Sequence, residues 1–243
     1  MCSLCEQNYH GAVMCALGWA CWKTYVGRPE ADTHRCWAMR TLGNSLSDHN
    51  QDALSVQEAE LSMLRRRGAP ESDILGVQCN LANTIHALGR FEQALQMDRD
   101  IYSGYLKLTG KQSRDTLEAA LKFADSLVDF ERFAEIKSLL QEVIPMARRV
   151  FGEHNIKTLK MRWLYAFALF KDDSATLADL HEAVTTLETI ANSWNRVLGP
   201  AHPETLSVQA ALACARDTLR ERETSSGMAT RTRAARARPT EEE

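Results

Sequence analysis

The sequence predicts an all-α protein built as a solenoid of stacked helix pairs. Two observations predict it. First, glycines recur at intervals of 41, 42, 42 and 47 residues, and the residues around them recur as well. Second, each interval between two glycines holds two apolar stretches with helical spacing. A repeat of this length is typical of a solenoid array. The recurring glycines are Gly27, Gly68, Gly110, Gly152 and Gly199.

The interval from Gly68 to Gly110 shows the content of one repeat. Its first apolar stretch has steps of three and four residues, as on one face of a helix: Ile74, Val77, Leu81, Ile85 and Leu88. Gly89-Arg90 interrupts it, and a second apolar run follows: Phe91, Ala94, Leu95, Ile101, Tyr102, Leu106 and Leu108. The unit is therefore helix, short turn, helix.

The ends of the helices can be placed from the same alignment. Glycine in the left-handed conformation closes a helix at little cost, so each recurring glycine marks the end of a second helix. A cation precedes four of them by three residues, where it offsets the helix dipole: Arg65, Lys107, Arg149 and Arg196. His202-Pro203-Glu204 is typical of a helix start.

Fourteen residues after each glycine stands a small residue, which lets two helix backbones approach closely. These residues are Thr41, Ala82, Ala124, Ala166 and Ala213. The position before it is apolar in four repeats, but Arg40 occupies it in the first. The interval 152–199 has five extra residues, which we expect in the loop near 171–178.

The chain divides into three parts. Residues 1–27 are the second helix of a truncated first repeat, 28–222 are about four helix pairs plus a closing helix, and 223–243 are a disordered tail. The uncharged stretch Gly11–Trp22 is too short to span a bilayer. It is a repeat helix rather than an export signal, since no cation precedes it. Its apolar side is left open because the chain is a fragment or because that end binds something. The tail arginines are solvated, or form a nuclear-import or nucleic-acid patch.

Two segments resemble the tetratricopeptide repeat. They are Asn80-Leu81-Ala82 followed by Gly-Arg-Phe-x-x-Ala-Leu at 89–95, and Leu-Gly-x-x-His-Pro-x-Thr-Leu at 198–206. The second is similar to the 42-residue form found in kinesin light chains. The resemblance covers roughly residues 9–219. It implies a right-handed superhelical solenoid of stacked antiparallel helix pairs. Asp98 departs from the pattern, because the family usually has an aromatic or aliphatic residue there.

The resemblance also implies where a partner binds. In tetratricopeptide arrays the first helices line a concave groove that takes an extended peptide or a partner helix. The polar and aromatic positions expected there are Asn80, Asn83, His86, Glu118, Lys122, Asp125, Lys160, Trp163 and Phe167. Asparagine amides can pair with the partner's backbone, charged groups can select charge, and the aromatic pair can anchor apolar residues. Each is equally open to being an ordinary helix-surface residue.

Composition and motifs argue against catalysis and against several classes of partner. The net charge of −3 gives no general attraction to nucleic acid or membrane. No phosphate loop, His-Glu-x-x-His or Gly-x-Ser-x-Gly occurs, so we expect no enzyme activity and no cofactor. Cys2-x-x-Cys5 has the spacing of half a zinc site, but a second pair is missing, so no metal is expected. The seven cysteines are expected to be reduced thiols.

The sequence therefore predicts a cytoplasmic scaffold or adaptor, kinesin-light-chain-like, that binds a protein or peptide. The alternative is the sensing or binding arm of a larger nucleotide-switched or protease-like enzyme with its catalytic domain upstream. The sequence leaves the partner's identity and the oligomeric state open.

Overall fold

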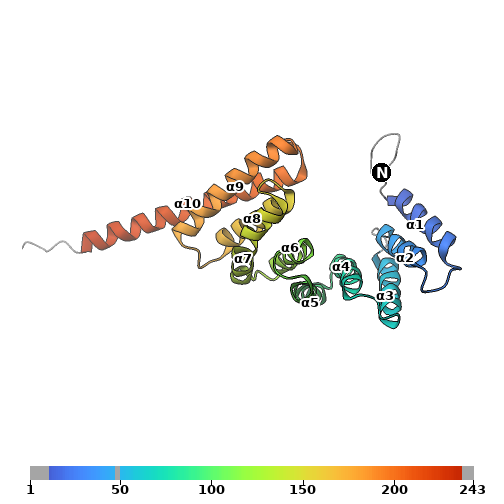
Figure 1. Cartoon of the computed structure of the whole chain (residues 1–243). Coiled ribbons are helices and arrows are strands. Elements are labelled where there is room, and N and C mark those ends of the chain that lie inside the picture. The colour runs from blue at the N-terminus through green and yellow to red at the C-terminus, as the bar shows by residue number, and fades with distance from the viewer. Residues whose placement is uncertain (1–10, 47–49, 237–243) are drawn as a thin grey trace, which may run out of the picture. The chain divides into compact units, whose positions relative to one another are not determined.

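The computed structural model describes residues 11–46 and 50–236, and it describes side chains as far as residue 225. Within these ranges it has ten helices and no strand (Figure 1). The helices are α1 (Gly11–Tyr25), α2 (Thr33–Ser45), α3 (Asn50–Arg66), α4 (Glu71–Ala87), α5 (Phe91–Thr109), α6 (Arg114–Val128), α7 (Phe133–Phe151), α8 (Ile156–Lys171), α9 (Leu177–Val197) and α10 (Pro203–Arg236). The predicted all-α class is confirmed.

The chain forms two compact units, which meet in sequence between Ser126 and Leu127. In unit 1 (up to Ser126), each of α1 to α4 packs on the helix that follows it. In unit 2 (from Leu127), α7 to α9 do the same, and α8 also contacts α10. Helices that pack on their sequence neighbours, with no central core, make a repeat solenoid.

The apolar core of unit 1 passes from one helix pair to the next. Leu54, Leu61 and Leu64 of α3 pack against α4 and Ala94 of α5. On the other side of α4, Leu75 and Ala82 pack with residues of α5 and with Ala119 of α6. Each first helix is therefore buried on two sides, by its own second helix and by a neighbouring pair.

The core of unit 2 contains fewer polar groups than that of unit 1. Its centre is a set of fully buried side chains on α9, which pack against α8 and α10: Leu180, Ala183, Leu187, Ile190 and Trp194. The long carboxylate and amide side chains that are buried in the described residues, Gln57, Glu60 and Asp98, all belong to unit 1.

Four of the five recurring glycines have positive φ, as expected at helix ends: Gly68, Gly110, Gly152 and Gly199. Two of these glycines have backbone angles outside the left-handed helical region that the sequence predicts for them. Gly110 has φ 77° and ψ 174°, and Gly152 has φ 102° and ψ 156°, a region that essentially only glycine occupies. Gly27 is the exception, because its φ is not positive.

The recurring threonine six residues after the glycine has a structural reason in two repeats. The Thr116 hydroxyl donates to the Gly110 carbonyl at 2.8 Å, and the Thr158 hydroxyl donates to the Ala147 carbonyl at 3.3 Å. Both threonines are buried. In both repeats the hydroxyl thus ties the start of a first helix to the end of the preceding second helix.

In the first repeat, the core positions of α2 are held by different residues from those that the spacing from Gly27 predicts. Leu42 is 2 % exposed and Gly43 is buried, so these two residues take the places of Leu81 and Ala82. Thr41 is only half-buried, and Arg40 does not occupy the apolar core position. The physical reason is the longer loop between Gly27 and α2, which shifts the helix relative to its glycine. The expectations for Thr41 and Arg40 were wrong.

The extra residues of the fourth interval are not confined to one loop. The connection between α8 and α9 covers residues 172–176, and α9 has 21 residues against 19 in α5 and in α7. The insertion is therefore divided between the loop and a longer second helix.

At the C-terminus, α10 continues through residues 223–236, where the sequence predicts a disordered tail. Arg222 donates to the carbonyls of Ala175 and Asp173, at 3.3 and 2.8 Å, and so fixes the helix to the α8–α9 loop. Alanine, arginine and glutamate favour helix beyond that point, and Pro239 is the next residue that forbids it. Residues 237–243 lie outside the described residues.

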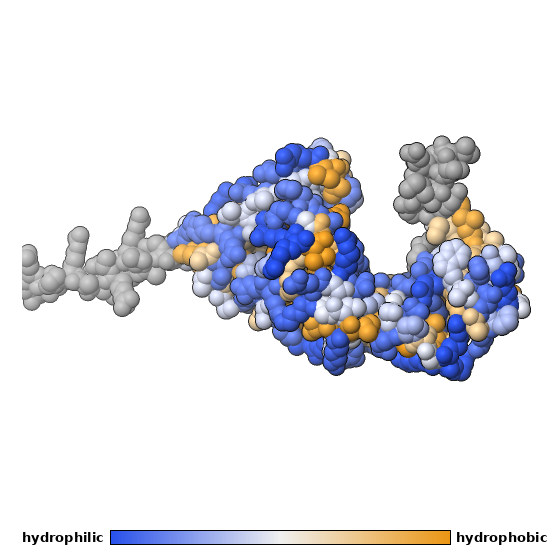
Figure 2. Space-filling model, viewed as in Figure 1, coloured by the Kyte–Doolittle hydropathy of each residue, from blue (hydrophilic) through white to orange (hydrophobic). Residues whose placement is uncertain are grey.

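At the other end, one side of α1 packs on α2 through Cys15 and Trp22. The backbones approach so closely at Gly18 that an added Cβ would lie 1.9 Å from the Ser45 hydroxyl oxygen. On the other side Val13, Leu17 and Trp19 are exposed. Figure 2 shows apolar residues of α1 at the surface in orange. Cys2 and Cys5, the half zinc site, lie outside the described residues.

Candidate partner-binding surfaces

The predicted groove residues fall into two sets, one in each unit. The unit 1 face comprises Asn80, Asn83, His86, Glu118, Lys122 and Asp125, on α4 and α6. The unit 2 face comprises Lys160, Trp163 and Phe167, on α8.

On α4, Asn83 is exposed, while Asn80 and His86 are half-buried. The His86 ring meets the Phe91 ring of α5 edge-on, with centroids 5.0 Å apart. Asn80 and Asn83 are one helical turn apart. Their amides therefore share one side of α4, where each can donate and accept hydrogen bonds.

On α6, Lys122 and Asp125 are exposed and Glu118 is half-buried. Lys122, Asp125 and His86 of α4 lie around the buried carboxyl of Asp98 on α5. Burial raises the pKa of Asp98, and Asp125 adds to this effect. The Ser126 hydrogen bond, Lys122 and His86 act in the opposite direction. The structure thus brings three of the predicted residues together around one acid.

Two further ionisable groups lie in the same region. Burial, with a smaller effect of Asp98, raises the pKa of the Cys79 thiol to about 11. Burial, followed by Cys79, raises the pKa of Tyr105 to about 12. Cys79 therefore stays a protonated thiol at neutral pH, which is the opposite of what a nucleophilic cysteine needs.

The unit 2 face is aromatic and bordered by lysines. The Trp163 and Phe167 rings lie 5.7 Å apart, and Phe167 also meets Phe133 of α7 at 6.3 Å. At one end Lys160 pairs with Glu204 of α10 at 2.6 Å, and at the other Lys171 lies over the Phe167 ring. Trp163 and Phe167 are half-buried against the core of unit 2, so they serve packing as well as any partner.

The corrected alignment of α2 adds residues that the sequence analysis missed. Counted from Leu42-Gly43, the residue that corresponds to Asn83 is Asn44, and those that correspond to Gly76 and Cys79 are Trp37 and Arg40. Trp37 is 62 % exposed. The similarity of Leu42-Gly43 to Leu81-Ala82 in the sequence would have identified Asn44, Trp37 and Arg40.

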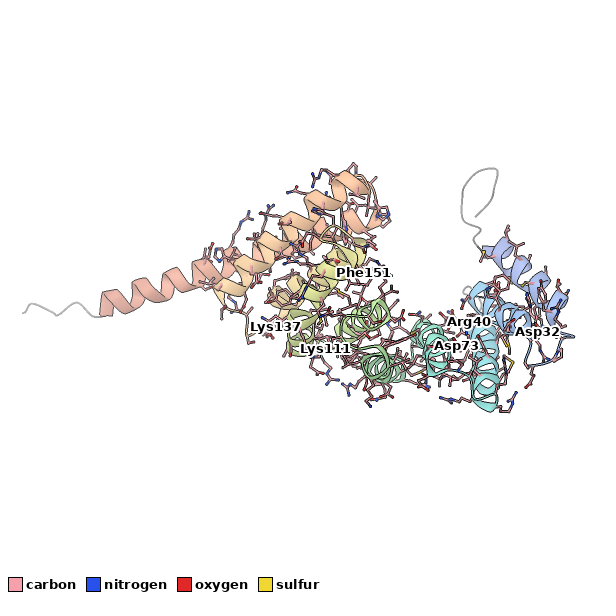
Figure 3. The ribbon with its side chains drawn as sticks, in the orientation of Figure 1. Asp32, Arg40, Asp73, Lys111, Lys137 and Phe151 are labelled. Carbon is pink, nitrogen blue, oxygen red and sulfur yellow. The ribbon has the colours of Figure 1, made fainter. Side chains whose placement is uncertain are left out.

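Trp37 and Arg40 line an open pocket of about 390 Å³ in unit 1. Leu64 of α3, Arg67 and Pro70 of the α3–α4 connection, and Asp73 of α4 line it as well. Arg40 and Asp73 are labelled in Figure 3. Besides α4, α6 and α8, α2 is therefore a further first helix with an accessible, chemically varied surface.

The described residues hold no group of three potential metal-ligating side chains. Nor is any described helix long and apolar enough to cross a bilayer.

No protein-family model and no curated protein matched the chain. Solved structures do. BtubC (BKLC) from P. vanneervenii is 14% identical, with a TM-score of 0.69 over 95% of this chain and 94% of its own. A putative kinesin light chain with nearly identical TPR-like repeats, from Podosopora anserina, is 19% identical, with a TM-score of 0.62 over 89% of this chain and 100% of its own.

A Rap protein complexed with competence and sporulation factor is 14% identical, with a TM-score of 0.53 over 85% of this chain and 58% of its own. At these identities the likeness concerns the fold. The chain has the fold of the TPR-like repeat proteins, of the kinesin-light-chain-like type that its sequence resembles.

Proposed function

We propose that the protein is a non-catalytic scaffold and that the accessible residues on the first helices of each unit, taken by itself, bind a segment of another protein. One observation carries the proposal. In each of α2, α4, α6 and α8 one corresponding residue is accessible between two buried neighbours: Asn44, Asn83, Asp125 and Phe167. In unit 1, Asn44, Asn83 and Asp125 form an accessible line whose exposed side chains are available to a partner. In unit 2, Phe167 is half-buried and packs partly on the core.

The chemistry of the accessible residues differs between the units. In unit 1 the first helices carry amides and charges, with Asn83 of α4 and Lys122 and Asp125 of α6. Asparagine amides can hold a peptide backbone of any sequence, while the charges select among partners. In unit 2 the half-buried Trp163 and Phe167 offer the aromatic surface that dominates binding energy in many interfaces.

The finer role that we propose is a kinesin-light-chain-like adaptor in the cytoplasm. The fold supports it, because one of the similar structures is described as a putative kinesin light chain.

Site-specific photo-crosslinking tests the proposal. The crosslinking amino acid p-benzoylphenylalanine replaces Asn83 or Asp125 on the accessible line. In matched controls it replaces Gln96 of α5 or Ser138 of α7, which are exposed on second helices. We expect a discrete crosslinked partner from the first pair of positions only. Equal crosslinking from first and second helices, or from second helices alone, would overturn the proposed surface.

A further inference from the structure

The contact between successive helix pairs has a different chemistry in the two units. On the second helices, one aligned residue is buried in every repeat: Gln57 in α3, Asp98 in α5, Leu140 in α7 and Leu187 in α9. The corresponding residues of the following first helices are buried as well: Thr84, Ser126, Ala168 and Ala215. At these positions unit 1 has polar residues where unit 2 has leucine and alanine. Asp98 is hydrogen-bonded to Ser126 of the next pair, whereas Gln57 lies close to Gly43 of α2.

The pair between α5 and α6 is a single hydrogen bond in a buried setting. The Ser126 hydroxyl donates to the Asp98 carboxylate at 2.5 Å, and the two residues are 6 % and 9 % exposed. A carboxylate has about four acceptor sites. Within the described residues Asp98 receives this one hydrogen bond, and the charged or ionisable groups around it are Cys79 and His86 of α4 and Lys122 and Asp125 of α6.

The corresponding position in α3 is under-satisfied in the same way. Gln57 is 3 % exposed, and its Oε1 has no hydrogen-bond partner in the described part of the chain. Buried polar groups without full hydrogen bonding destabilise the closed contact. When the contact opens, water forms the missing hydrogen bonds. A leucine packed on an alanine gains nothing by opening. The contacts of unit 1 therefore open at a lower free energy than those of unit 2.

We propose that the contact between α5 and α6, centred on Asp98 and Ser126, is an adjustable joint of the array. It opens locally before the leucine–alanine contacts of unit 2. Because Asn83 lies on α4 and Asp125 on α6, opening changes the separation of these two residues on the accessible line. This second consequence rests on the proposed function, whereas the opening itself does not.

Hydrogen–deuterium exchange on the full chain without a partner tests the joint. The double variant Asp98→Leu/Ser126→Ala gives unit 1 the pair that unit 2 already has. We expect the amides in the middle of α5 and α6 to exchange at least tenfold faster than those of α8 and α9 in the wild type. In the variant, exchange in α5 and α6 should slow at least tenfold, and exchange in α8 and α9 should not change.

The matched control is Asp100→Ala, which removes an exposed carboxylate from the same helix and should leave exchange in α6 unchanged. Wild-type exchange as slow in α5 and α6 as in α8 and α9 overturns the joint, as does unchanged exchange in the double variant. If the double variant does not fold, Asp98→Asn replaces it, and unchanged exchange in α6 is then the contrary result. If the double variant, whose joint stays closed, is crosslinked to the partner as well as the wild type is, only the proposed role of the joint in binding is overturned.

Discussion

Arg40 of α2 donates through its Nε to Glu60 Oε1 of α3 at 2.9 Å, and Glu60 is only 1% exposed while Arg40 is 37% exposed. Burial raises the pKa of Glu60, and Arg40 opposes the effect through its hydrogen bond and its charge. This pair joins the two helices of the first pair, at the border of the pocket formed by Trp37 and Arg40.

Replacing Arg40 by alanine should destabilise unit 1 by about 3 kcal/mol, because the buried Glu60 loses its counter-charge. Arg66→Ala is the control, since Arg66 pairs with Glu30 at the surface, where such pairs contribute about 0–1 kcal/mol. Urea denaturation followed by circular dichroism measures both. Equal losses of stability in the two variants would show that Glu60 does not depend on Arg40.

Asp98 should make the protein less stable as the pH rises. Its pKa is raised in the folded state above the reference value of 3.8, so the folded chain holds that proton more tightly than the unfolded chain. The resulting stability is present below the unfolded pKa and is lost as the pH rises through the folded pKa. Asp98→Asn should therefore stabilise at neutral pH, by about 1 kcal/mol, with a gain that shrinks toward acid.

Asp172 provides a control, because its pKa is shifted in the opposite direction from that of Asp98. Hydrogen bonds from Lys137 and Ser174 lower its pKa to about 2, and Lys137 (labelled in Figure 3) lies 2.5 Å away. Its stabilisation is present above the reference pKa of 3.8 and is lost as the pH falls through about 2. Melting temperatures from pH 2 to 8, measured for the wild type, Asp98→Asn and Asp172→Asn, show how the effect of each substitution depends on pH. The same trend in both would contradict the assignment for Asp98.

Glu131→Gly should stabilise unit 2 by about 0.5–1 kcal/mol. Glu131, in the turn before α7, has φ 53° and is the non-glycine residue with positive φ in the described part of the chain. The corresponding turn before α5 has Gly89 at φ 76°. An L-residue in this conformation is strained by roughly 1–2 kcal/mol, more than the entropy that glycine loses on folding.

The reciprocal change, Gly89→Ala, should destabilise by about 1 kcal/mol, since nothing lies within 4 Å of the position that its Cβ would occupy and only the backbone opposes it. Denaturant midpoints measure both effects. A destabilised Glu131→Gly variant would mean that the Glu131 side chain contributes more than the strain costs.

Asn80→Ala/Asn83→Ala should weaken partner binding at least tenfold and change the stability by less than about 1 kcal/mol, since Asn83 is exposed and the Asn80 side chain lies outside the core. Titration calorimetry with the crosslinked partner, once purified, gives the affinity. Gln93→Ala/Gln96→Ala on the exposed side of α5 is the matched control. Unchanged affinity in the asparagine variant would remove α4 from the binding surface.

Sequence reasoning predicted the repeat well because its marks are local. Gly110 and Gly152 are required by backbone conformation, and Thr116 and Thr158 by the carbonyls that they satisfy. The alignment of α2 could not be counted from Gly27, because a loop of different length precedes that helix. Burial, not distance from a glycine, identifies Leu42 as the core residue.

The candidate surfaces were harder to foresee. Which helix positions face away from the pair follows from the period, so Asn83 and Asp125 could be chosen from the sequence. That Asp98 lies buried beneath His86 and Lys122 could not, because it depends on how α4, α5 and α6 pack. The structure also places Trp163 partly in the core, which its spacing alone leaves open.

The most direct measurement is an experimental structure of the chain with its crosslinked partner. The account predicts that Asn83 and Asp125 in unit 1, or Phe167 in unit 2, lose accessible surface to the partner, while the exposed residues of the second helices do not. A partner seated on the apolar side of α1, or on second helices such as α5 and α7, with Asn83, Asp125 and Phe167 still open to solvent, would contradict it.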